Sequence, residues 1–318
     1  MRYRCAVLDD YQNVARGLAD WDRIAGDVDV TVFNEHLGGP EAVQRALREF
    51  HIVCMMRERT PFRRDTLEAL PDLRLLITTG SRNPSIDFAA AKERGVTVCG
   101  TRSYGHPTSG ITFGLILELT RRIGWENHHL KSGARWQTTL GPDLEGMTLG
   151  ILGLGKLGLR VAGIAKAFGM NVTAWSANLT EERCREAGVA YARREDLFRT
   201  ADVVTVHMVL GDRSRGLVGE NELALMKPTA FIVNTSRGPI IQEQALIAAL
   251  AARRIAGAGL DVFDVEPLPL EHPFRTMDNV VITPHLGYVS AQNYRCYFPD
   301  IVENIRAFID GAPVRAMT

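Results

Sequence analysis

Short runs of β-branched and apolar residues alternate with amphipathic helical patterns along almost the whole of the 318-residue chain. In the first hundred residues, the runs expected to form strands lie at 4–9, 28–33, 51–56 and 73–78. Helical patterns follow at 39–50 and 85–95. This alternation is typical of a parallel sheet covered by helices on both faces. We therefore expect an α/β fold.

A second series of expected strands follows a long helical pattern at 108–131. These strands lie at 148–153, 171–176, 202–208, 230–235, 257–262 and 279–284. Six strands separated mostly by helices suit a doubly wound parallel sheet. The 108–131 pattern is apolar around much of its circumference, so we expect it to be largely buried. From Ser290 to Gly311 the pattern predicts one amphipathic helix.

The charge balance and cysteine pattern exclude several classes of protein. Lys plus Arg and Asp plus Glu each total 37, which argues against an electrostatic nucleic-acid or membrane-surface binder. No apolar run approaches the ~20 residues that cross a bilayer, and the first residues do not form a signal peptide. The five cysteines form no CxxC pair and no metal-ligand spacing. We expect a cytoplasmic protein with reduced cysteines and no metal site.

A glycine-rich turn directly follows the first strand of the second series. Gly153 permits the tight turn, Gly155 allows close approach of a pyrophosphate, and Gly158 allows close packing of helix on strand. The amides at the helix start, including those of Lys156 and Leu157, are expected to bind a diphosphate. A glycine turn without a ligand is the alternative. The strand–turn–helix context favours a dinucleotide site.

The end of the next strand leaves the choice of dinucleotide open. NAD enzymes usually place an acidic residue there, on the adenosine ribose, and this chain has Ser176. No carboxylate repels a 2′-phosphate, and the candidate arginine, Arg183, lies only in the next helix. We expect NAD or NADP as the cofactor, with NAD slightly favoured.

Three later strands are each followed by a polar side chain suited to the reduction of a 2-keto acid. Arg237, Glu266 and His285 are thereby expected in one crevice, since ligands bind at the carboxyl ends of parallel strands. A histidine has an ordinary pKa near ~6.5 and can exchange a proton with the substrate oxygen. A carboxylate can orient that imidazole, and a guanidinium can bind the substrate carboxylate. Each residue alone is more often structural, but the set favours catalysis.

The segments GLGKLG, NTSRGP, GLDVFDVEP and TPHLG occur in the order found in the D-isomer-specific 2-hydroxyacid dehydrogenases, which the chain resembles along essentially its whole length. The resemblance implies a Rossmann doubly wound cofactor domain, 101–290, inserted into a smaller flavodoxin-like α/β substrate domain, 1–100 and 291–318. The chain ends 33 residues (318 minus 285) after His285. It thus resembles a short phosphoglycerate dehydrogenase without the appended regulatory domain.

The resemblance also implies roles for particular residues. His285 corresponds to the acid–base, Glu266 to its partner, Arg237 to the substrate-carboxylate arginine and Asp261 to the group holding the nicotinamide carboxamide. The other residues implied to contact the cofactor are Ser176, His207, Met208, Val209, Thr235, Ser236 and Gly287.

On the substrate side, the backbone amides of Gly80 and Ser81 correspond to the family's carboxylate-binding loop. That loop departs from the family pattern, because it reads GSRN followed by Pro84. Arg57 is a further candidate for an anionic substrate, although a solvated loop charge explains it equally well.

These observations predict an NAD(P)-dependent D-2-hydroxyacid dehydrogenase that acts on the CH–OH group of a small 2-hydroxy or 2-keto acid. One alternative is a nicotinamide-sensing protein similar to the corepressors of this fold. Another is formate dehydrogenase, which pairs its histidine with Gln rather than with a residue such as Glu266. The family usually forms homodimers, and we expect one here. The particular acid and the physiological direction stay open.

Overall fold

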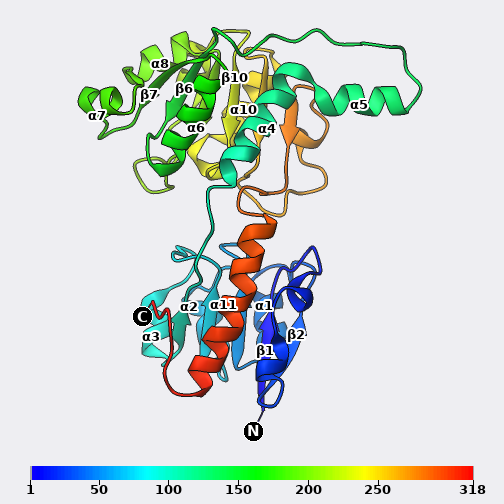
Figure 1. Cartoon of the computed structure of the whole chain (residues 1–318), viewed down its shortest axis with the longest axis vertical. Coiled ribbons are helices and arrows are strands. Elements are labelled where there is room, and N and C mark those ends of the chain that lie inside the picture. The colour runs from blue at the N-terminus through cyan, green and yellow to red at the C-terminus, as the bar shows by residue number, and fades with distance from the viewer. Residues whose placement is uncertain (1, 318) are drawn as a thin grey trace. The chain divides into compact units, whose positions relative to one another are not determined.

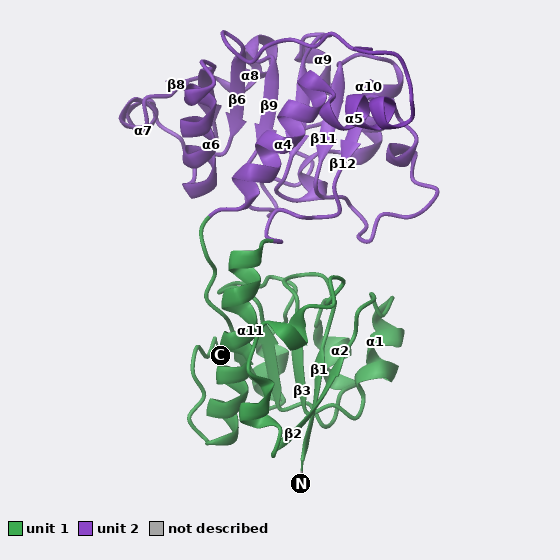
Figure 2. Cartoon of the chain, turned by 45° about the vertical axis from the view of Figure 1, so that its right-hand side comes forward, with its two compact units in different colours: residues 1–105, 290–318 green, residues 106–289 purple. Residues whose placement is uncertain are grey.

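The computed structural model describes residues 2–317 and divides into two compact units. Unit 1 comprises the described residues up to Gly105 and those from Ser290 onward, and unit 2 spans 106–289 (Figure 2). Residues 1 and 318, which the predicted substrate domain included, lie outside the described residues. The assignment of one unit to the substrate and the other to the cofactor stays a prediction.

Unit 1 is built on a parallel sheet with the strand order β2-β1-β3-β4-β5. Its strands are β1 (Tyr3–Val7), β2 (Val28–Val32), β3 (Ile52–Met55), β4 (Leu75–Thr78) and β5 (Thr97–Cys99). Its helices are α1 (Pro40–Leu47), α2 (Arg64–Glu68), α3 (Phe88–Glu93) and α11 (Ala291–Ile309), with 3₁₀ turns η1 (Ala15–Gly17) and η2 (Trp21–Ile24). This strand order is that of the flavodoxin-like fold.

Helices cover both faces of this sheet. Leu47 of α1 and Leu67 of α2 pack with alternate strand residues such as Val53 and Leu76 on one face. On the other face, α11 packs against β4 and η2 (Figure 1). Because both faces are covered, all residues of β3 and β4 are buried, as in other parallel sheets.

Unit 2 is built on a longer parallel sheet with the order β12-β11-β10-β9-β6-β7-β8. Its strands are β6 (Thr148–Leu152), β7 (Asn171–Trp175), β8 (Ala190–Tyr191), β9 (Val203–Val206), β10 (Phe231–Asn234), β11 (Gly257–Leu260) and β12 (Val280–Ile282). Its helices are α4 (Thr108–Arg121), α5 (Ile123–Lys131), α6 (Lys156–Ala167), α7 (Glu181–Glu186), α8 (Arg194–Thr200), α9 (Glu220–Leu225) and α10 (Glu243–Ala251), with η3 (Gly238–Ile240) and η4 (Pro273–Arg275).

The sheet of unit 2 is doubly wound, as the sequence predicts. Helices α8, α9 and α10 pack on one face, and α4 and α6 pack on the other. The strand order reverses between β6 and β9, and such a switch point opens a ligand-binding crevice at the carboxyl ends of the strands. Two short strands, β5 and β8, were not among those expected, because three- and two-residue strands leave no readable pattern.

The helical pattern at 108–131 forms two helices rather than one. Arg122 adopts a left-handed conformation with φ 49° and separates α4 from α5. Helix α4 buries Phe113, Leu115 and Ile116, but α5 has no buried residue. The expectation that the whole pattern is largely buried is therefore wrong for α5, because the break at Arg122 turns its apolar side chains away from the core.

In unit 1, one buried carboxylate links the C-terminal helix to the segment after β5. Asp300 is fully buried on α11 and accepts hydrogen bonds from the Arg102 backbone amide (2.8 Å) and guanidinium (2.6 Å). The Arg102 side chain is 71% exposed, so removal of the Asp300 carboxylate mainly deprives the Arg102 backbone amide of its acceptor. We predict that Asp300→Ala lowers the free energy of unfolding by about 2–3 kcal/mol, measured by urea denaturation. Asp310→Ala, which removes an exposed ion pair from the same helix, serves as the control and should have little effect.

In unit 2, burial lowers the pKa of His207, at the end of β9, to about 4. Its Nδ1 is buried without a hydrogen-bond partner in the described residues. An unfolded histidine takes up a proton near pH ~6.5, so the unfolded state binds protons first as the pH falls. We predict that up to about 3 kcal/mol of stability present above pH ~6.5 is lost by pH ~4. The free energy of unfolding, measured by urea denaturation between these pH values, should depend less steeply on pH in His207→Gln than in the wild type. An identical pH dependence in the two proteins would contradict the prediction.

Candidate active site

The loops that carry the predicted site residues of unit 2 leave the sheet at one edge. Leu152 pairs with Val206, Val206 with Asn234, and Asn234 with Leu260, so β6, β9, β10 and β11 end in register. Leu260 in turn pairs with Ile282 at the end of β12. The residues after each strand therefore gather at the carboxyl edge of the sheet.

The glycine turn after β6 has the close contacts that its sequence predicts. Gly153 has φ +99°, and a Cβ there would lie 2.6 Å from the carbonyl oxygen of His207, across the switch point. A Cβ at Gly158 would lie 2.2 Å from the Gly153 carbonyl oxygen, so α6 packs directly on the turn. Bulkier residues at these positions would separate the helix from the strands.

The same turn also fits a diphosphate. A Cβ at Gly155 would meet no atom within 4 Å, which leaves open space above the turn. The amides of Gly155, Lys156 and Leu157, at the start of α6, donate to no acceptor within residues 2–317. Unpaired amides at a helix N-terminus bind anions, so the chain offers the donors that a dinucleotide diphosphate requires.

Beside the turn lies a pocket of about 610 Å³. Of the predicted cofactor residues, Gly153, Gly155, Ser176, Met208 and Val209 line it. His207 does not, and its imidazole Nε2 instead lies 3.0 Å from the Thr205 hydroxyl.

Two further residues of this pocket, Asn178 and Arg213, were not predicted from the sequence. Arg213 belongs to the loop after β9. Nothing in the sequence indicates that this loop reaches the end of β7, because the two strands are separated in the sheet by β6.

His285 and Glu266 form a hydrogen-bonded pair at the carboxyl edge. Nδ1 of His285 lies 2.6 Å from Oε2 of Glu266, and the other carboxylate oxygen accepts the Phe263 amide at 3.0 Å. Both side chains are mostly enclosed, with exposed fractions of 15% and 25%. The carboxylate is thus fixed by the backbone of its own loop, and it fixes one ring nitrogen of the histidine.

The turn that presents His285 is held by Asp261. This carboxylate is fully buried and accepts hydrogen bonds from the Thr283 hydroxyl (2.6 Å) and from the amides of Leu286 (2.7 Å) and Gly287 (2.8 Å). Burial raises its pKa. His285 itself lies in the left-handed region, with φ 53°. The hydrogen bonds to Asp261 on both sides of His285 stabilise this conformation. The role of Asp261 toward the nicotinamide carboxamide stays a prediction.

Arg237 follows β10 on a loop that contacts the loop of Glu266. A Cβ at Gly238 would lie 2.1 Å from the backbone of Phe263, so the two loops touch at their main chains. Asn234 accepts the Ser236 amide and donates to the Arg237 carbonyl, which fixes the turn. The Arg237 guanidinium donates to the Ser236 carbonyl at 2.6 Å.

Neighbouring hydrogen bonds hold the other residues predicted near the nicotinamide. The Ser236 hydroxyl donates to the Met208 carbonyl at 2.8 Å, which ties the β10 loop to the β9 loop. The Thr235 hydroxyl lies 3.0 Å from that of Thr112 on α4. Gly287 accepts the Thr108 hydroxyl at 2.8 Å. Helix α4 thus supports this end of the edge.

The three predicted substrate residues lie in unit 1, at the carboxyl ends of β3 and β4. Gly80 has φ +87°, and a Cβ there would lie 2.0 Å from Nη1 of Arg57, so the guanidinium rests on the glycine. The Gly80 amide donates to the Thr101 hydroxyl at 2.8 Å, whereas Ser81 is exposed. Buried Asn83 donates to the Arg57 carbonyl at 2.7 Å and fixes this loop.

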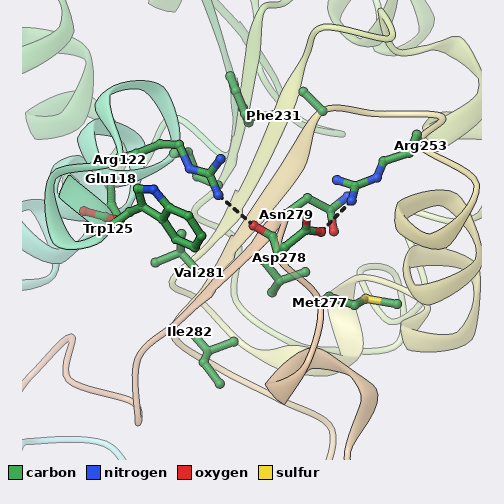
Figure 3. A pocket seen from close by; sticks show the side chains of 13 residues that line it. Glu118, Arg122, Trp125, Phe231, Arg253, Met277, Asp278, Asn279, Val281 and Ile282 are labelled. Atoms are coloured by element: carbon green, nitrogen blue, oxygen red, sulfur yellow. Dashed lines mark hydrogen bonds and ion pairs between the residues drawn. The ribbon is translucent and has the colours of Figure 1, made fainter. Parts of the chain in front are cut away.

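A second pocket of unit 2, of about 560 Å³, lies at the opposite edge of the sheet, at the start of β10 and β12 (Figure 3). None of the predicted site residues lines it. Its two arginines, Arg122 and Arg253, both point toward Asp278, where Arg253 forms an ion pair of 2.5 Å and Arg122 donates to the carbonyl. Both arginine side chains of this pocket thus have a hydrogen-bonding partner on Asp278.

Residues 2–317 contain neither a metal-binding cluster nor a helix suited to a membrane. No cluster of three or more His, Cys, Asp or Glu side chains has an arrangement that could hold a metal ion. No helix in this range combines the length and apolar character needed to span a bilayer.

Comparison with known proteins places this geometry in one family. Residues 113–287 match the model of the D-isomer specific 2-hydroxyacid dehydrogenase NAD-binding domain. The chain is 38% identical to a glyoxylate reductase of Aeropyrum pernix, over 78% of this chain and 76% of the relative. It is 30% identical to a hydroxypyruvate reductase of Blautia hydrogenotrophica, over 99% of both chains.

A crystal structure of a phosphoglycerate oxidoreductase from Vibrio cholerae shares the fold, with a TM-score of 0.91 and 36% identity over 98% of this chain and 100% of that one. The family model covers more than half of the chain, and the predicted fold class is confirmed. The chain belongs to the D-isomer specific 2-hydroxyacid dehydrogenases, oxidoreductases that act on CH–OH groups.

Proposed function

We propose that this protein reduces a small 2-keto acid to the D-2-hydroxy acid, and catalyses the reverse oxidation, with His285 as the acid–base. The observation that carries the proposal is the 2.6 Å contact between His285 Nδ1 and Glu266, on a turn fixed by Asp261. Relatives named glyoxylate reductase and hydroxypyruvate reductase support this substrate class.

The pair has the arrangement that proton transfer to a carbonyl oxygen requires. Reduction of a ketone develops negative charge on its oxygen, and a protonated imidazole can neutralise that charge by donating from Nε2. Glu266 holds Nδ1 and stabilises the imidazolium, which keeps Nε2 directed at the substrate. In the oxidative direction the same Nε2 accepts the hydroxyl proton. A bound nicotinamide cofactor supplies or accepts the hydride.

Arg237 is proposed to bind the substrate carboxylate, because a guanidinium fork matches a carboxylate in a two-point hydrogen bond. Its loop touches the loop of Glu266 through Gly238, which supports a common site for Arg237 and the histidine pair. From unit 1, we propose Ser81 and Arg57 as further contacts of the anionic substrate. The Gly80 amide is already used by Thr101, so Gly80 contributes mainly its conformation.

The cofactor is proposed to lie across the switch point of unit 2. Gly155, Lys156 and Leu157 offer amides for the diphosphate, and the pocket bounded by Ser176, Met208 and Val209 receives the adenosine. Thr235, Ser236, Asp261 and Gly287 lie toward the nicotinamide. His207 is proposed to act only through its backbone, which packs on Gly153.

We predict that His285→Ala lowers kcat for glyoxylate and hydroxypyruvate by about 10²–10⁴-fold, because the proton donor is lost. Nucleotide binding, measured by quenching of tryptophan fluorescence, should be unchanged. Glu266→Gln, which keeps the shape but removes the charge, should give a smaller loss. Unchanged turnover of His285→Ala would rule out the acid–base role.

The same assay defines the substrate. A panel of 2-keto acids with NADH and NADPH in parallel, with formate plus NAD as the comparison, would identify the acid that is used. Oxidation of formate in place of 2-keto acid reduction would contradict the proposed reaction.

We also propose that the protein is a homodimer formed through α5 and the segment that follows it. Ile123, Trp125 and Leu130 of α5 are exposed, and so are Trp136 (73%) and Leu140 (101%) in the segment. Figure 1 shows α5 projecting from the body of unit 2. Exposed large apolar side chains gathered in one segment are typical of association sites.

The apolar segment is held in place rather than left loose. Glu126 of α5 accepts hydrogen bonds from the Thr138 amide (3.0 Å) and the Thr139 hydroxyl (2.6 Å). Hydrogen bonding by Thr139 and Thr138 lowers the pKa of this carboxyl, although burial opposes it. The backbone between Trp136 and Leu140 is therefore tied to α5, which supports association through this segment.

We predict that Trp136→Asp combined with Leu140→Asp converts the dimer to a monomer, because both charges would be buried on association. Light scattering after size-exclusion chromatography measures the mass. The control is Phe168→Asp, since Phe168 is also exposed (40%) but lies at the end of α6. A wild-type mass of one chain at all concentrations would contradict the dimer.

A further inference from the structure

We propose that the adenosine pocket of unit 2 selects NADP(H) over NAD(H), with Arg183 and Arg213 binding the 2′-phosphate. This inference rests on the proposed function and decides the cofactor that the sequence leaves open. It reverses the slight expectation of NAD, because the structure gathers residues that lie far apart in the sequence.

The end of β7 lacks the group that recognises NAD. An acidic side chain at this position accepts hydrogen bonds from the ribose hydroxyls and repels a 2′-phosphate. Here Ser176 occupies the position and, with Asn178, lines the pocket. Both side chains are neutral and carry hydrogen-bond donors, which suit phosphate oxygens. Neither provides the repulsion by which NAD enzymes exclude NADP.

Two arginines from different loops line the same pocket. Arg183 comes from α7, directly after β7, and Arg213 comes from the loop after β9. Arg183, Arg213 and Asp212 are the charged residues of the lining, so the pocket carries a net charge of +1 (two positive, one negative). A guanidinium binds phosphate by two parallel hydrogen bonds and remains charged at all physiological pH values.

Both guanidinium groups are available for an anion. Within residues 2–317, neither Arg183 nor Arg213 forms an ion pair. Other arginines of unit 2 are paired, such as Arg194 with Glu222 and Arg199 with Glu195. In the second pocket, by contrast, Arg253 forms an ion pair with Asp278 and Arg122 donates a hydrogen bond to the Asp278 carbonyl.

The loop that carries Arg213 has an ordered conformation. Ser214 is buried, its hydroxyl accepts the Gly211 amide at 2.9 Å, and it donates to the Val209 carbonyl at 2.7 Å. The Arg215 amide donates to the Gly211 carbonyl at 2.9 Å. Arg213 is therefore presented on a closed turn, so less conformational entropy is lost when it binds.

Direct binding tests the inference without turnover. NADPH and NADH are titrated separately into the whole protein, and binding is followed by calorimetry and by tryptophan fluorescence, since Trp175 lines the pocket. We expect NADPH to bind at least about tenfold more tightly, as two charged hydrogen-bonding partners allow. The fragments 2′,5′-ADP and 5′-ADP should rank in the same order. The preference should weaken as salt increases.

Variants then assign the preference to particular residues. Arg183→Ala and Arg213→Ala should each weaken NADPH binding by about tenfold and leave NADH binding unchanged. Arg199→Ala removes an exposed arginine outside the pocket and should change neither NADPH binding nor NADH binding. Asp212→Asn should strengthen NADPH binding, because it removes the single negative charge of the lining.

The outcomes separate this inference from the proposed function. Equal or tighter binding of NADH, or equal loss of both nucleotides in the arginine variants, would overturn NADP(H) selection and leave the dehydrogenase assignment intact. Failure of wild-type protein to bind either nucleotide would overturn both.

Discussion

The buried carboxylate of Asp261 organises the carboxyl edge of the unit 2 sheet. It sits at the end of β11 and accepts hydrogen bonds from a hydroxyl and two amides that belong to the turn after β12. A carboxylate removed from water is costly unless its oxygens are satisfied, so the turn and the carboxylate stabilise each other. The left-handed conformation of His285 lies within this turn. The position of the imidazole beside Glu266 therefore depends on Asp261.

The other side of the edge depends on glycines rather than on charge. Gly153 and Gly158 allow β6, α6 and the loop after β9 to approach more closely than any side chain would permit. Gly238 does the same for the loops of Arg237 and Glu266. These contacts are made by backbone atoms, at the edge where the cofactor and substrate are proposed to bind.

Much of the fold and site could be predicted from local patterns. The doubly wound sheet follows from alternating strands and helices, and the glycine turn follows from its strand–turn–helix context. Two short strands were missed, since so few residues carry no periodicity. The break at Arg122 was also missed, because a left-handed residue other than glycine has no local signature. The exposure of α5 follows from that break.

The sequence by itself determined the family, the fold class and the order of the polar residues along successive strands, because these depend on local spacing and on segments read in order. Only the tertiary structure decided which loops touch. In the structure, Arg213 lines the same pocket as Ser176, and the Gly80 amide donates to the Thr101 hydroxyl. Both carboxylate oxygens of Asp261 accept hydrogen bonds from the turn after β12. Such contacts join residues that are distant in the chain, and strand order and register, rather than local sequence, bring them together.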